Sequence, residues 1–455
     1  MHGWNGDVER LAENILAYAQ QRLALDPLPL DNTRPLSELQ AQAGSTITAS
    51  GLGGEEALRI FADVLAPACI TANHPRFLAF IPCAPTEASM LFDLVVGASS
   101  MCGSNWLEAA GATYAENQAL RWIADLAGFP PGAGGTFVQG GTIANISALV
   151  TARHAVRDRM ETSHAGAQRW AVAVSPDVHS SLSEAAEVMD VDLVVVRVDD
   201  DQRLRGAELA RVLDAVGSRG DQKVFAVVAS AGTTNLGVID DLRSVGTVAA
   251  ERGIWFHVDG AYGAAALAAP SARQRFAGIE LADSFIVDPH KWLFAPFDCA
   301  ALIYREPELA RATHAQHASY LEPLAQTGEW NPADYAIHLT RRARGLPFWF
   351  SLATYGTNAY SQALERTLEV ARYTAKAVQN RDYLTLVREP ELSVVCFRRT
   401  GWTRDKYDRW SQKLRDDGIA FVTPTTHLGE VMARVAIVNP QTSESDIDAV
   451  LDSMA

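Results

Sequence analysis

Strand-like apolar runs alternate with helical stretches from about residue 76 to residue 304, and this pattern constrains the fold more than any other feature. The clearest runs cover residues 170–174, 193–198, 224–229, 254–258, 285–287 and 300–304. Runs that are continuously apolar must be covered on both faces of a sheet. The pattern therefore predicts an α/β fold with a mostly parallel central sheet and helices on both faces. Ligands of such sheets bind outside the carboxyl ends of the strands.

The sequence predicts three parts, of which the large α/β domain at residues 76–345 is the central one. Residues 1–75 begin with a helix at 8–23, and Pro27 and Pro29 then start an extended arm. Because a short helix and an arm cannot bury their own apolar side chains, this part should pack on something larger, such as another subunit.

Residues 346–455 are predicted to form a smaller α+β domain. The expected elements are helices at 348–375, 406–415 and 443–454 and strands near 394–397 and 435–438. Before this domain, residues 313–332 are polar and lack helical or strand periodicity, so they are predicted to form a long loop. Loops of this length in a compact domain are usually functional or disordered.

Composition excludes several kinds of partner and site. Of the 455 residues 48% are apolar, and the net charge of −15 argues against nucleic acid or an anionic membrane as the main partner. No apolar run is long enough to cross a bilayer. The five cysteines are scattered without a Cys-x-x-Cys pair, which favours reduced thiols in a cytoplasm. Neither a metal site nor a serine-hydrolase motif is recognisable.

Lys291 follows one of the apolar runs, in the sequence Asp288-Pro289-His290-Lys291-Trp292. A lysine is rarely placed next to a buried strand without a partner. When it is desolvated there, it can attack a carbonyl as a neutral amine. Considered alone, a lysine at a strand end would more often point into solvent.

Asp259 follows the apolar run at 254–258, and His257 lies on the same face of that strand. A carboxylate beside a pyridine nitrogen keeps the nitrogen protonated through a charge-assisted bond worth roughly 1.5–3 kcal/mol. A protonated ring of this kind accepts electrons from a substrate carbanion. An aspartate before glycine is also typical of a simple turn. The combination of Asp259 with Lys291 predicts pyridoxal phosphate (PLP) as the cofactor.

A glycine-rich turn, Gln139-Gly140-Gly141-Thr142, lies between a predicted strand and an apolar helix. Paired glycines let backbone N–H groups approach an anion, and the helix N-terminus adds partial positive charge. The turn therefore predicts a phosphate site. The segment Ala231-Gly232-Thr233-Thr234 follows another strand, and it either lines the same crevice or forms an ordinary turn.

His179 precedes a predicted helix, in which Ser181 and Glu184 have the spacing of a capping box. An imidazole held at this place could stack over a cofactor ring and offer a proton or a hydrogen bond. The alternative is an ordinary loop histidine beside the start of a helix.

Taken in this order, the segments resemble the group II PLP-dependent amino-acid decarboxylases, which include the aromatic-amino-acid, histidine, tyrosine and glutamate enzymes. The resemblance covers nearly the whole chain. Besides the glycine turn, the matching segments are His74-Pro75-Arg76-Phe77, His179-Ser180-Ser181, Gly232-Thr233-Thr234, His257-Val258-Asp259, Ala282-Asp283-Ser284-Phe285, His290-Lys291-Trp292, Phe297-Asp298-Cys299, and Arg341-Arg342 through Trp349-Phe350. The resemblance implies PLP fold type I, an amino-acid substrate, and a homodimer with active sites at the subunit interface.

The resemblance also assigns roles to matching positions. Lys291 would bind the cofactor aldehyde and Asp259 the ring nitrogen, while His179 would stack on the ring opposite Ala261. The other positions expected to contact the cofactor are Gly141, Thr142, Thr233, Asp288 and His290. Tyr320, in the long loop, matches the tyrosine that delivers a proton to the substrate carbon after CO₂ leaves. Related plant aldehyde synthases carry phenylalanine there, so Tyr320 favours simple decarboxylation.

Departures from the family pattern concern the substrate. The aromatic-amino-acid enzymes have larger aromatic side chains at the positions of Ala72, Ile81, Cys83, Cys102 and Ser104. With fewer aromatic side chains at these positions, the pocket is less suited to substrates that carry an indole or catechol ring. Arg434 matches a segment with a carboxylate-binding arginine in glutamate decarboxylase, and the alternative for it is a surface charge beside a strand.

The expected reaction is PLP-dependent decarboxylation of an L-amino acid to the primary amine and CO₂, with aromatic amino acids among the candidates. Three alternatives stay open. The chain could be an aldehyde synthase or a transaminase, a decarboxylase of a non-aromatic or acidic amino acid, or a PLP-binding homologue without activity.

Overall fold

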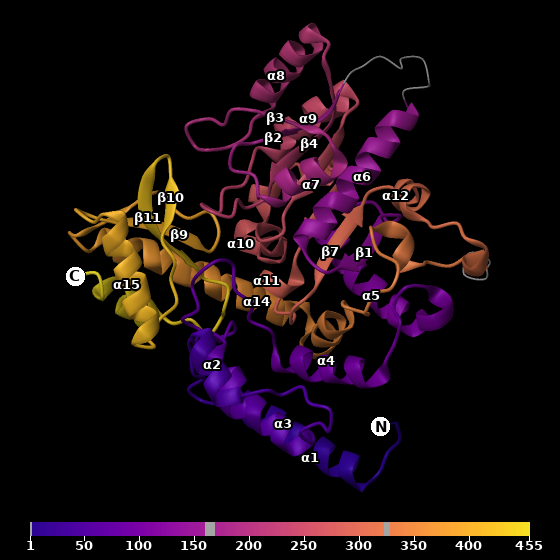
Figure 1. Ribbon diagram of the computed structural model, residues 1–455. Helices are drawn as coiled ribbons and strands as arrows, with labels where there is room; N and C mark the ends of the chain where they lie inside the picture. The colour runs from indigo at the N-terminus through magenta and orange to yellow at the C-terminus, as the bar shows by residue number, and fades with distance from the viewer. Residues whose placement is uncertain (1, 160–168, 323–327) are drawn as a thin grey trace.

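A seven-stranded sheet forms the centre of the molecule in the computed structural model (Figure 1). The structure describes residues 2–159, 169–322 and 328–455. The strands, in the sheet order β1-β7-β6-β5-β4-β2-β3, are β1 (Gly134–Val138), β7 (Ala300–Tyr304), β6 (Ser284–Val287), β5 (Trp255–Asp259), β4 (Gln222–Ser230), β2 (Arg169–Val174) and β3 (Asp192–Val195). Within the described ranges, only β7 runs antiparallel to its neighbours. The predicted α/β fold with a mostly parallel sheet is confirmed.

Helices cover both faces of this sheet. One face is covered by α6 (Gly141–Arg159), α7 (Ser181–Met189) and α12 (Pro307–His314). The other face is covered by α5 (Trp106–Leu126), α8 (Gly206–Arg219), α9 (Leu242–Arg252) and part of α14 (Leu346–Gln379). Successive side chains of a strand point to opposite faces, so Val172 and Val174 join the first core while Ala171 and Ala173 join the second.

A smaller antiparallel sheet lies in the C-terminal part of the chain, beside the long helix α14 (Figure 1). Its strands, in the order β10-β11-β9-β8, are β10 (Thr425–His427), β11 (Glu430–Ala436), β9 (Val394–Arg399) and β8 (Leu384–Leu386). Two helices, α15 (Arg404–Asp416) and α16 (Glu444–Asp452), pack on it with the second half of α14. The helices and β9 lie close to where the sequence predicts them, whereas β11 begins five residues before the predicted strand at 435–438 and ends at Ala436.

The N-terminal helices lie along one side of the molecule, at the bottom of Figure 1. They are α1 (Gly6–Leu23), α2 (Leu36–Ala43), α3 (Gly54–Ile60) and α4 (Glu87–Ser99). The side chain of Asn5 accepts hydrogen bonds from the N–H groups of Asp7 and Val8 and so caps α1. No residue of α1 or α2 is buried, which agrees with the expectation that this part cannot cover its own apolar side chains.

The structure corrects some predicted bounds. The strand β3 ends at Val195, and the predicted loop at 313–332 starts only after His314, where α12 ends. The loop also contains a short helical turn at Ser319–Leu321. The domain bounds stay a prediction, although Leu78, near the predicted start of the large domain, forms backbone hydrogen bonds with Phe421 and Ala436 of the C-terminal part.

Among the described residues, no helix is both long enough and apolar enough to span a bilayer. The described residues also contain no group of three or more His, Cys, Asp or Glu side chains that could hold a metal ion.

A buried ion pair connects α5 to the segment before α14. The guanidinium of Arg341 donates to both carboxylate oxygens of Glu116, at 2.8 and 2.9 Å, and both side chains are almost fully buried. The N–H of Gly345 also donates to Glu116, at 2.7 Å. The pair therefore fixes the entry of α14, the helix that spans both sheets.

We predict that Glu116→Ala destabilises the protein by about 3–5 kcal/mol, because it leaves the Arg341 charge buried without a partner. Urea unfolding followed by tryptophan fluorescence measures the effect. The matched control is Glu56→Ala, which removes a bidentate partner from Arg59 on the exposed surface of α3. This control should leave the unfolding midpoint nearly unchanged. Equal midpoints for the two variants would contradict the assignment.

Candidate functional site

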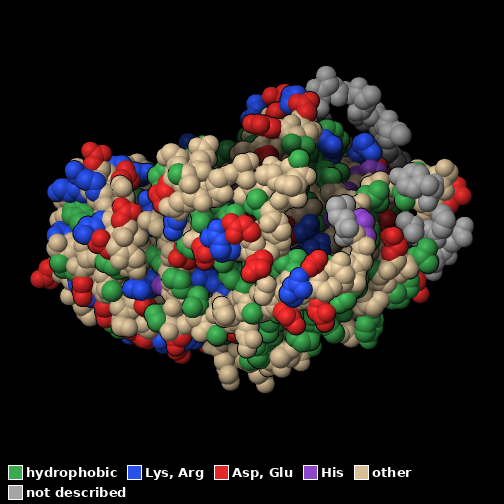
Figure 2. Space-filling view, turned by 60° about the horizontal axis from the view of Figure 1, so that its bottom comes forward, with side chains coloured by type: hydrophobic (Ala, Val, Ile, Leu, Met, Phe, Trp, Pro, Cys, Tyr) green, Lys and Arg blue, Asp and Glu red, His purple; other side chains and the backbone are tan. Residues whose placement is uncertain are grey.

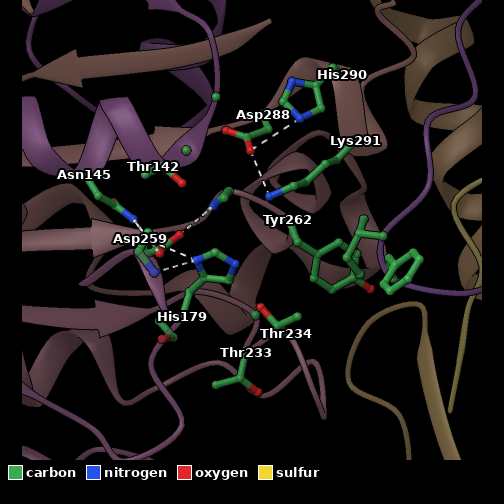
Figure 3. Close-up of a pocket in the computed structure, with 18 of the residues that line it drawn as sticks. Thr142, Asn145, His179, Thr233, Thr234, Asp259, Tyr262, Asp288, His290 and Lys291 are labelled. Atoms are coloured by element: carbon green, nitrogen blue, oxygen red, sulfur yellow. Dashed lines mark hydrogen bonds and ion pairs between the residues drawn. The ribbon is translucent and has the colours of Figure 1, made fainter. Parts of the chain in front are cut away.

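A cavity of about 500 Å³ opens at one edge of the central sheet, where β1, β2, β4, β5 and β6 all have their carboxyl ends. These strands run in the same direction, so the segments that follow them meet at this edge. Nine of the ten predicted site residues line the cavity, namely Gly141, Thr142, His179, Thr233, Asp259, Ala261, Asp288, His290 and Lys291. All of them except Gly141 and Ala261 are labelled in Figure 3. The roles assigned to them stay predictions.

Lys291 reaches the cavity from α11 (Pro289–Trp292), a short helix after β6. Its Nζ lies 2.8 Å from Oδ2 of Asp288, and its side chain is 23% exposed. The next residue, Trp292, is fully buried, and its ring stacks on that of Tyr262 with 5.1 Å between the centroids. Packing therefore fixes α11 on one side, and the amine of Lys291 is presented to the cavity on the other.

His290 lies beside this ion pair, with its Nε2 3.7 Å from Oδ2 of Asp288. Its Nδ1 accepts a hydrogen bond from the N–H of Cys299, at 3.1 Å. Burial lowers the pKa of His290, so the neutral ring carries its proton on Nε2, toward Asp288. The imidazole can thus donate a hydrogen bond to an anion in this corner of the cavity.

The N-terminus of α6 borders the cavity at Gly141 and Thr142. The first N–H groups of a helix have no partner inside the helix and carry partial positive charge. A Cβ atom on Gly141 would lie 3.2 Å from Oδ2 of Asp288 and 3.3 Å from Cβ of Ala261. A side chain here would crowd both atoms, and glycine keeps the first turn of α6 open to the cavity. These residues therefore fit the phosphate of PLP. The cavity volume is also in the range of cofactor sites.

Asp259 is the last residue of β5, and its carboxylate lies in the cavity across from Lys291 (Figure 3). Oδ1 accepts a hydrogen bond from the N–H of Ala261 at 3.1 Å, and Oδ2 accepts one from Nδ2 of Asn145 at 3.0 Å. Each oxygen thus has one donor from the protein, which fixes the orientation of the carboxylate. The arrangement fits an anion that binds the protonated ring nitrogen of PLP.

The prediction that His257 shares a face with Asp259 is confirmed, because both side chains contact Asn145. Nε2 of His257 lies 2.9 Å from Oδ1 of Asn145. Burial lowers the pKa of His257 to about 4, so this histidine is neutral at pH 7 and does not compete with the cofactor for the Asp259 charge.

His179 enters the cavity from the segment between β2 and α7. Its Nδ1 lies 2.9 Å from the hydroxyl oxygen of Ser181 and accepts the N–H of Ser181 at 3.1 Å. The predicted capping box is wrong. The cap position is Ser180, which has no side-chain capping bond, and the hydroxyl of Ser181 contacts His179 and Asn145 instead. Ser181 thus orients the imidazole.

Thr233 belongs to a tight turn after β4. Its hydroxyl accepts the N–H of Val238 at 3.1 Å, and its carbonyl accepts the N–H of Gly237 at 2.8 Å. The segment forms a turn and also lines the cavity, so both alternatives from the sequence are correct.

Two other predictions have different outcomes. The backbone of Tyr320 lies in the helical turn Ser319–Leu321, but its side chain lies outside the described part of the structure. Arg434 is buried in β11, and its guanidinium donates to the backbone carbonyls of Phe80, Thr234 and Asn235. The surface-charge alternative for Arg434 is therefore wrong, and carboxylate binding stays a prediction.

Further side chains line the cavity that the sequence does not single out. Phe80 and Asp177 belong to loops that no periodicity or motif marks. Phe297 and Asp298 belong to the matching segment Phe297-Asp298-Cys299, to which the sequence assigns no role. Of the five positions named for the substrate, only Ile81 appears among the described residues that line the cavity. Asn145 could have been found from its spacing, because it lies one helical turn after Gly141 and thus on the same face of α6.

Comparison with known proteins agrees with this geometry. The model of the pyridoxal-dependent decarboxylase conserved domain matches residues 53–400. The chain is 27% identical over 451 residues to the aromatic-L-amino-acid decarboxylase of Bacillus atrophaeus, covering 95% of this chain and 92% of that protein. It is 31% identical over 395 residues to the L-2,4-diaminobutyrate decarboxylase of Rhizobium meliloti (strain 1021), covering 85% and 78%.

Solved structures show the same fold. The crystal structure of Oryza sativa TDC with PLP and tryptamine superposes with a TM-score of 0.91 at 23% identity, covering 100% of this chain and 99% of that one. That of mouse CSAD superposes with a TM-score of 0.88 at 22% identity, covering 98% of each chain. The fold is thus PLP fold type I, and the domain match shows that this chain belongs to the pyridoxal-dependent decarboxylase family.

Proposed function

We propose that this enzyme removes the α-carboxylate of an L-amino acid as CO₂ and releases the primary amine. The observation that carries the proposal is the arrangement of three groups in one cavity (Figure 3). The amine of Lys291 and the carboxylate of Asp259 lie across from each other, and the N-terminus of α6 offers a phosphate site in the same cavity. PLP supplies an aldehyde that holds the substrate amine and a ring that accepts the electrons left by departing CO₂.

Lys291 and Asp288 work as a pair in this proposal. Oδ2 of Asp288 lies 2.8 Å from Nζ of Lys291, so this carboxylate is placed to hold the amine of Lys291 in the cavity. The same ion pair would receive the lysine again each time it is released. Nε2 of His290 lies 3.7 Å from the same oxygen and borders the pair.

Asp259 and His179 act on the cofactor ring. The Asp259 carboxylate, held by Asn145 and Ala261, keeps the ring nitrogen protonated. Nδ1 of His179 accepts from Ser181, so a neutral imidazole carries its proton on Nε2. That proton is free to contact the cofactor or the substrate carboxylate.

The substrate side chain is proposed to be aromatic. Phe80 and Phe297 line the cavity and are 59% and 56% exposed, so two rings are available at its mouth. Asp298 is neutralised by an ion pair with Arg344. The alternative is a cationic side chain, as in 2,4-diaminobutyrate. It is favoured by Asp177, which lines the cavity and has no ion-pair partner among the described residues.

We also propose a homodimer. Apolar side chains of α4 and α5 are exposed, namely Leu91, Leu94, Val95, Leu107 and Tyr114. Figure 2 shows hydrophobic side chains gathered on the face that carries these and the N-terminal helices. Exposed apolar side chains gathered on one face mark interaction surfaces. A second copy of the chain would also cover α1 and α2, which contain no buried residue.

The cysteines support a proposed cytoplasmic location. All five are free thiols. Burial raises the pKa of Cys83 to about 12 and that of Cys396 to about 11, so these thiols stay protonated and unreactive. A chain with several unpaired thiols suits a reducing compartment.

Replacing Lys291 by Ala should lower CO₂ release by on the order of a thousandfold or more, because neither the covalent attachment nor the proton transfer remains. The assay uses a panel of L-amino acids that contains tryptophan, tyrosine, histidine, 2,4-diaminobutyrate and glutamate, and it thereby also identifies the side chain. The visible absorbance that PLP gains on joining a protein amine should disappear as well.

The control for this variant is Lys413→Ala, which removes an exposed lysine on α15. It should behave as the wild type in both assays. A Lys291→Ala protein with normal CO₂ release would overturn the assignment.

Tyr320→Phe should change the product. If Tyr320 delivers the proton, its loss leaves the substrate carbon open to O₂, and the products become the aldehyde, ammonia, hydrogen peroxide and CO₂. Mass spectrometry of the organic product and a peroxide assay measure the switch. Tyr355→Phe, on the exposed surface of α14, is the control. Unchanged amine formation in Tyr320→Phe would count against the proposed role.

The wild type should have twice the mass of the chain in light scattering, and the double variant Leu94→Glu/Leu107→Glu should shift it toward the monomer. Two charges in an apolar interface are unfavourable because each must be desolvated. Leu428→Glu, at an exposed position in the C-terminal part, should leave the mass unchanged. A monomeric wild type would contradict the dimer.

A further inference from the structure

Asn145 lies at the centre of a buried hydrogen-bond chain that connects the core of the sheet to the candidate site. The chain contains Trp255 and His257 of β5, Ser284 of β6, Asn145 of α6 and Ser181 of α7. Each of these side chains is almost fully buried. Segments far apart in the sequence therefore meet at one asparagine, which was not among the predicted site residues.

The direction of every bond in the inner half of the chain is fixed by chemistry. Nε1 of Trp255 can only donate, and it does so to the hydroxyl of Ser284 at 2.9 Å. That hydroxyl is 2.8 Å from Nδ1 of His257, and it donates its proton there because the ring proton of neutral His257 must be on Nε2, which faces an acceptor oxygen of Asn145. Neutral His257 then carries its proton on Nε2 and donates to Oδ1 of Asn145, at 2.9 Å.

The outer half of the chain follows from this direction. With Oδ1 occupied by His257, the amide of Asn145 turns both protons of Nδ2 toward the site. One goes to Oδ2 of Asp259 at 3.0 Å and the other to the hydroxyl of Ser181 at 3.0 Å. The proton of Ser181 is then directed to Nδ1 of His179. A flipped amide would place its oxygen against the Asp259 carboxylate and its protons against the His257 proton.

We propose that Asn145 is a positioning residue that holds the carboxylate of Asp259 toward the ring nitrogen of PLP and, through Ser181, orients His179. The inference rests on the proposed function of Asp259. Oδ1 of Asp259 is bonded to Ala261 and Oδ2 to Asn145, so each oxygen has one fixed donor. Without the donor from Asn145, the carboxylate would lose half of the support for its charge and its orientation.

Binding of two ligands distinguishes the positioning role of Asn145 from a general effect of its replacement on folding. PLP is compared with its 1-deaza analogue, in which carbon replaces the ring nitrogen while the aldehyde and the phosphate remain. The full-length protein is freed of cofactor, and the dissociation constant of each ligand is measured by tryptophan fluorescence. Only the contact between Asp259 and the ring nitrogen distinguishes the two ligands.

In the wild type the analogue should bind at least about tenfold more weakly than PLP. Asn145→Ala should weaken PLP binding by about ten- to a hundredfold and change binding of the analogue by less than about threefold. The ratio of the two dissociation constants, analogue over PLP, then falls toward one. Asn145→Ser is the second variant, because serine leaves a smaller change in the buried volume and is too short to reach Asp259.

The possible outcomes are distinct. If both ligands lose affinity by the same factor in the Asn145 variants, Asn145 has only a structural role and the inference is wrong. If the wild type itself does not prefer PLP over the analogue, the proposed contact of Asp259 fails, and the inference fails with it.

Thr151→Val is the matched control on the same helix. Thr151 is also fully buried and hydrogen-bonded, with the carbonyl of Ser147 at 3.1 Å and with His314 at 3.0 Å, but it lies outside the chain. Thr151→Val should lower the unfolding midpoint as an Asn145 variant does. It should nevertheless bind PLP more tightly than the 1-deaza analogue by the same factor as the wild type. Loss of that preference in Thr151→Val would show that any damage to α6 changes it, and would overturn the inference.

Discussion

The covering of the central sheet on both faces is the constraint on which the rest of the structure depends. Once helices pack on both faces, polar side chains of the strands can meet water or a ligand only at the strand ends. Six of the described strands end at the same edge, and there Asp259, Asp288 and His179 come together. The position of the site is therefore a consequence of strand direction rather than of any single motif.

Burial then decides what the polar groups at this edge can do. A polar group removed from water is unfavourable unless it has a partner, and the chain from Trp255 to Asp259 supplies one to each member. The same partners fix the direction of each proton. The same two hydrogen bonds serve stability and chemistry at Asp259. They give the buried carboxylate its partners, and they fix its orientation toward the cofactor site.

The helices α1 and α2 of the N-terminal part are formed without being buried within this chain. The side chain of Asn5 caps α1, yet neither helix contains a buried residue. The apolar side chains of α4 and α5 on the same side are exposed too. Local structure is complete in this region while tertiary burial is not, which is the state expected of a surface that packs on another chain.

The sequence by itself determined the fold class, the edge of the sheet that carries the site, and nine residues that line the cavity. These follow from apolar periodicity, from glycine and proline positions, and from a family resemblance carried by short contiguous motifs. Only the tertiary structure decided that Asn145 joins His257 to Asp259, that Ser181 orients His179 instead of capping α7, and that Arg434 is buried. The contacts of Asn145 and the burial of Arg434 depend on segments far apart in the chain, and local sequence patterns carry no record of such contacts. The contact of Ser181 with His179 is local, but the hydroxyl could equally have capped the helix, and only the structure decides between the two.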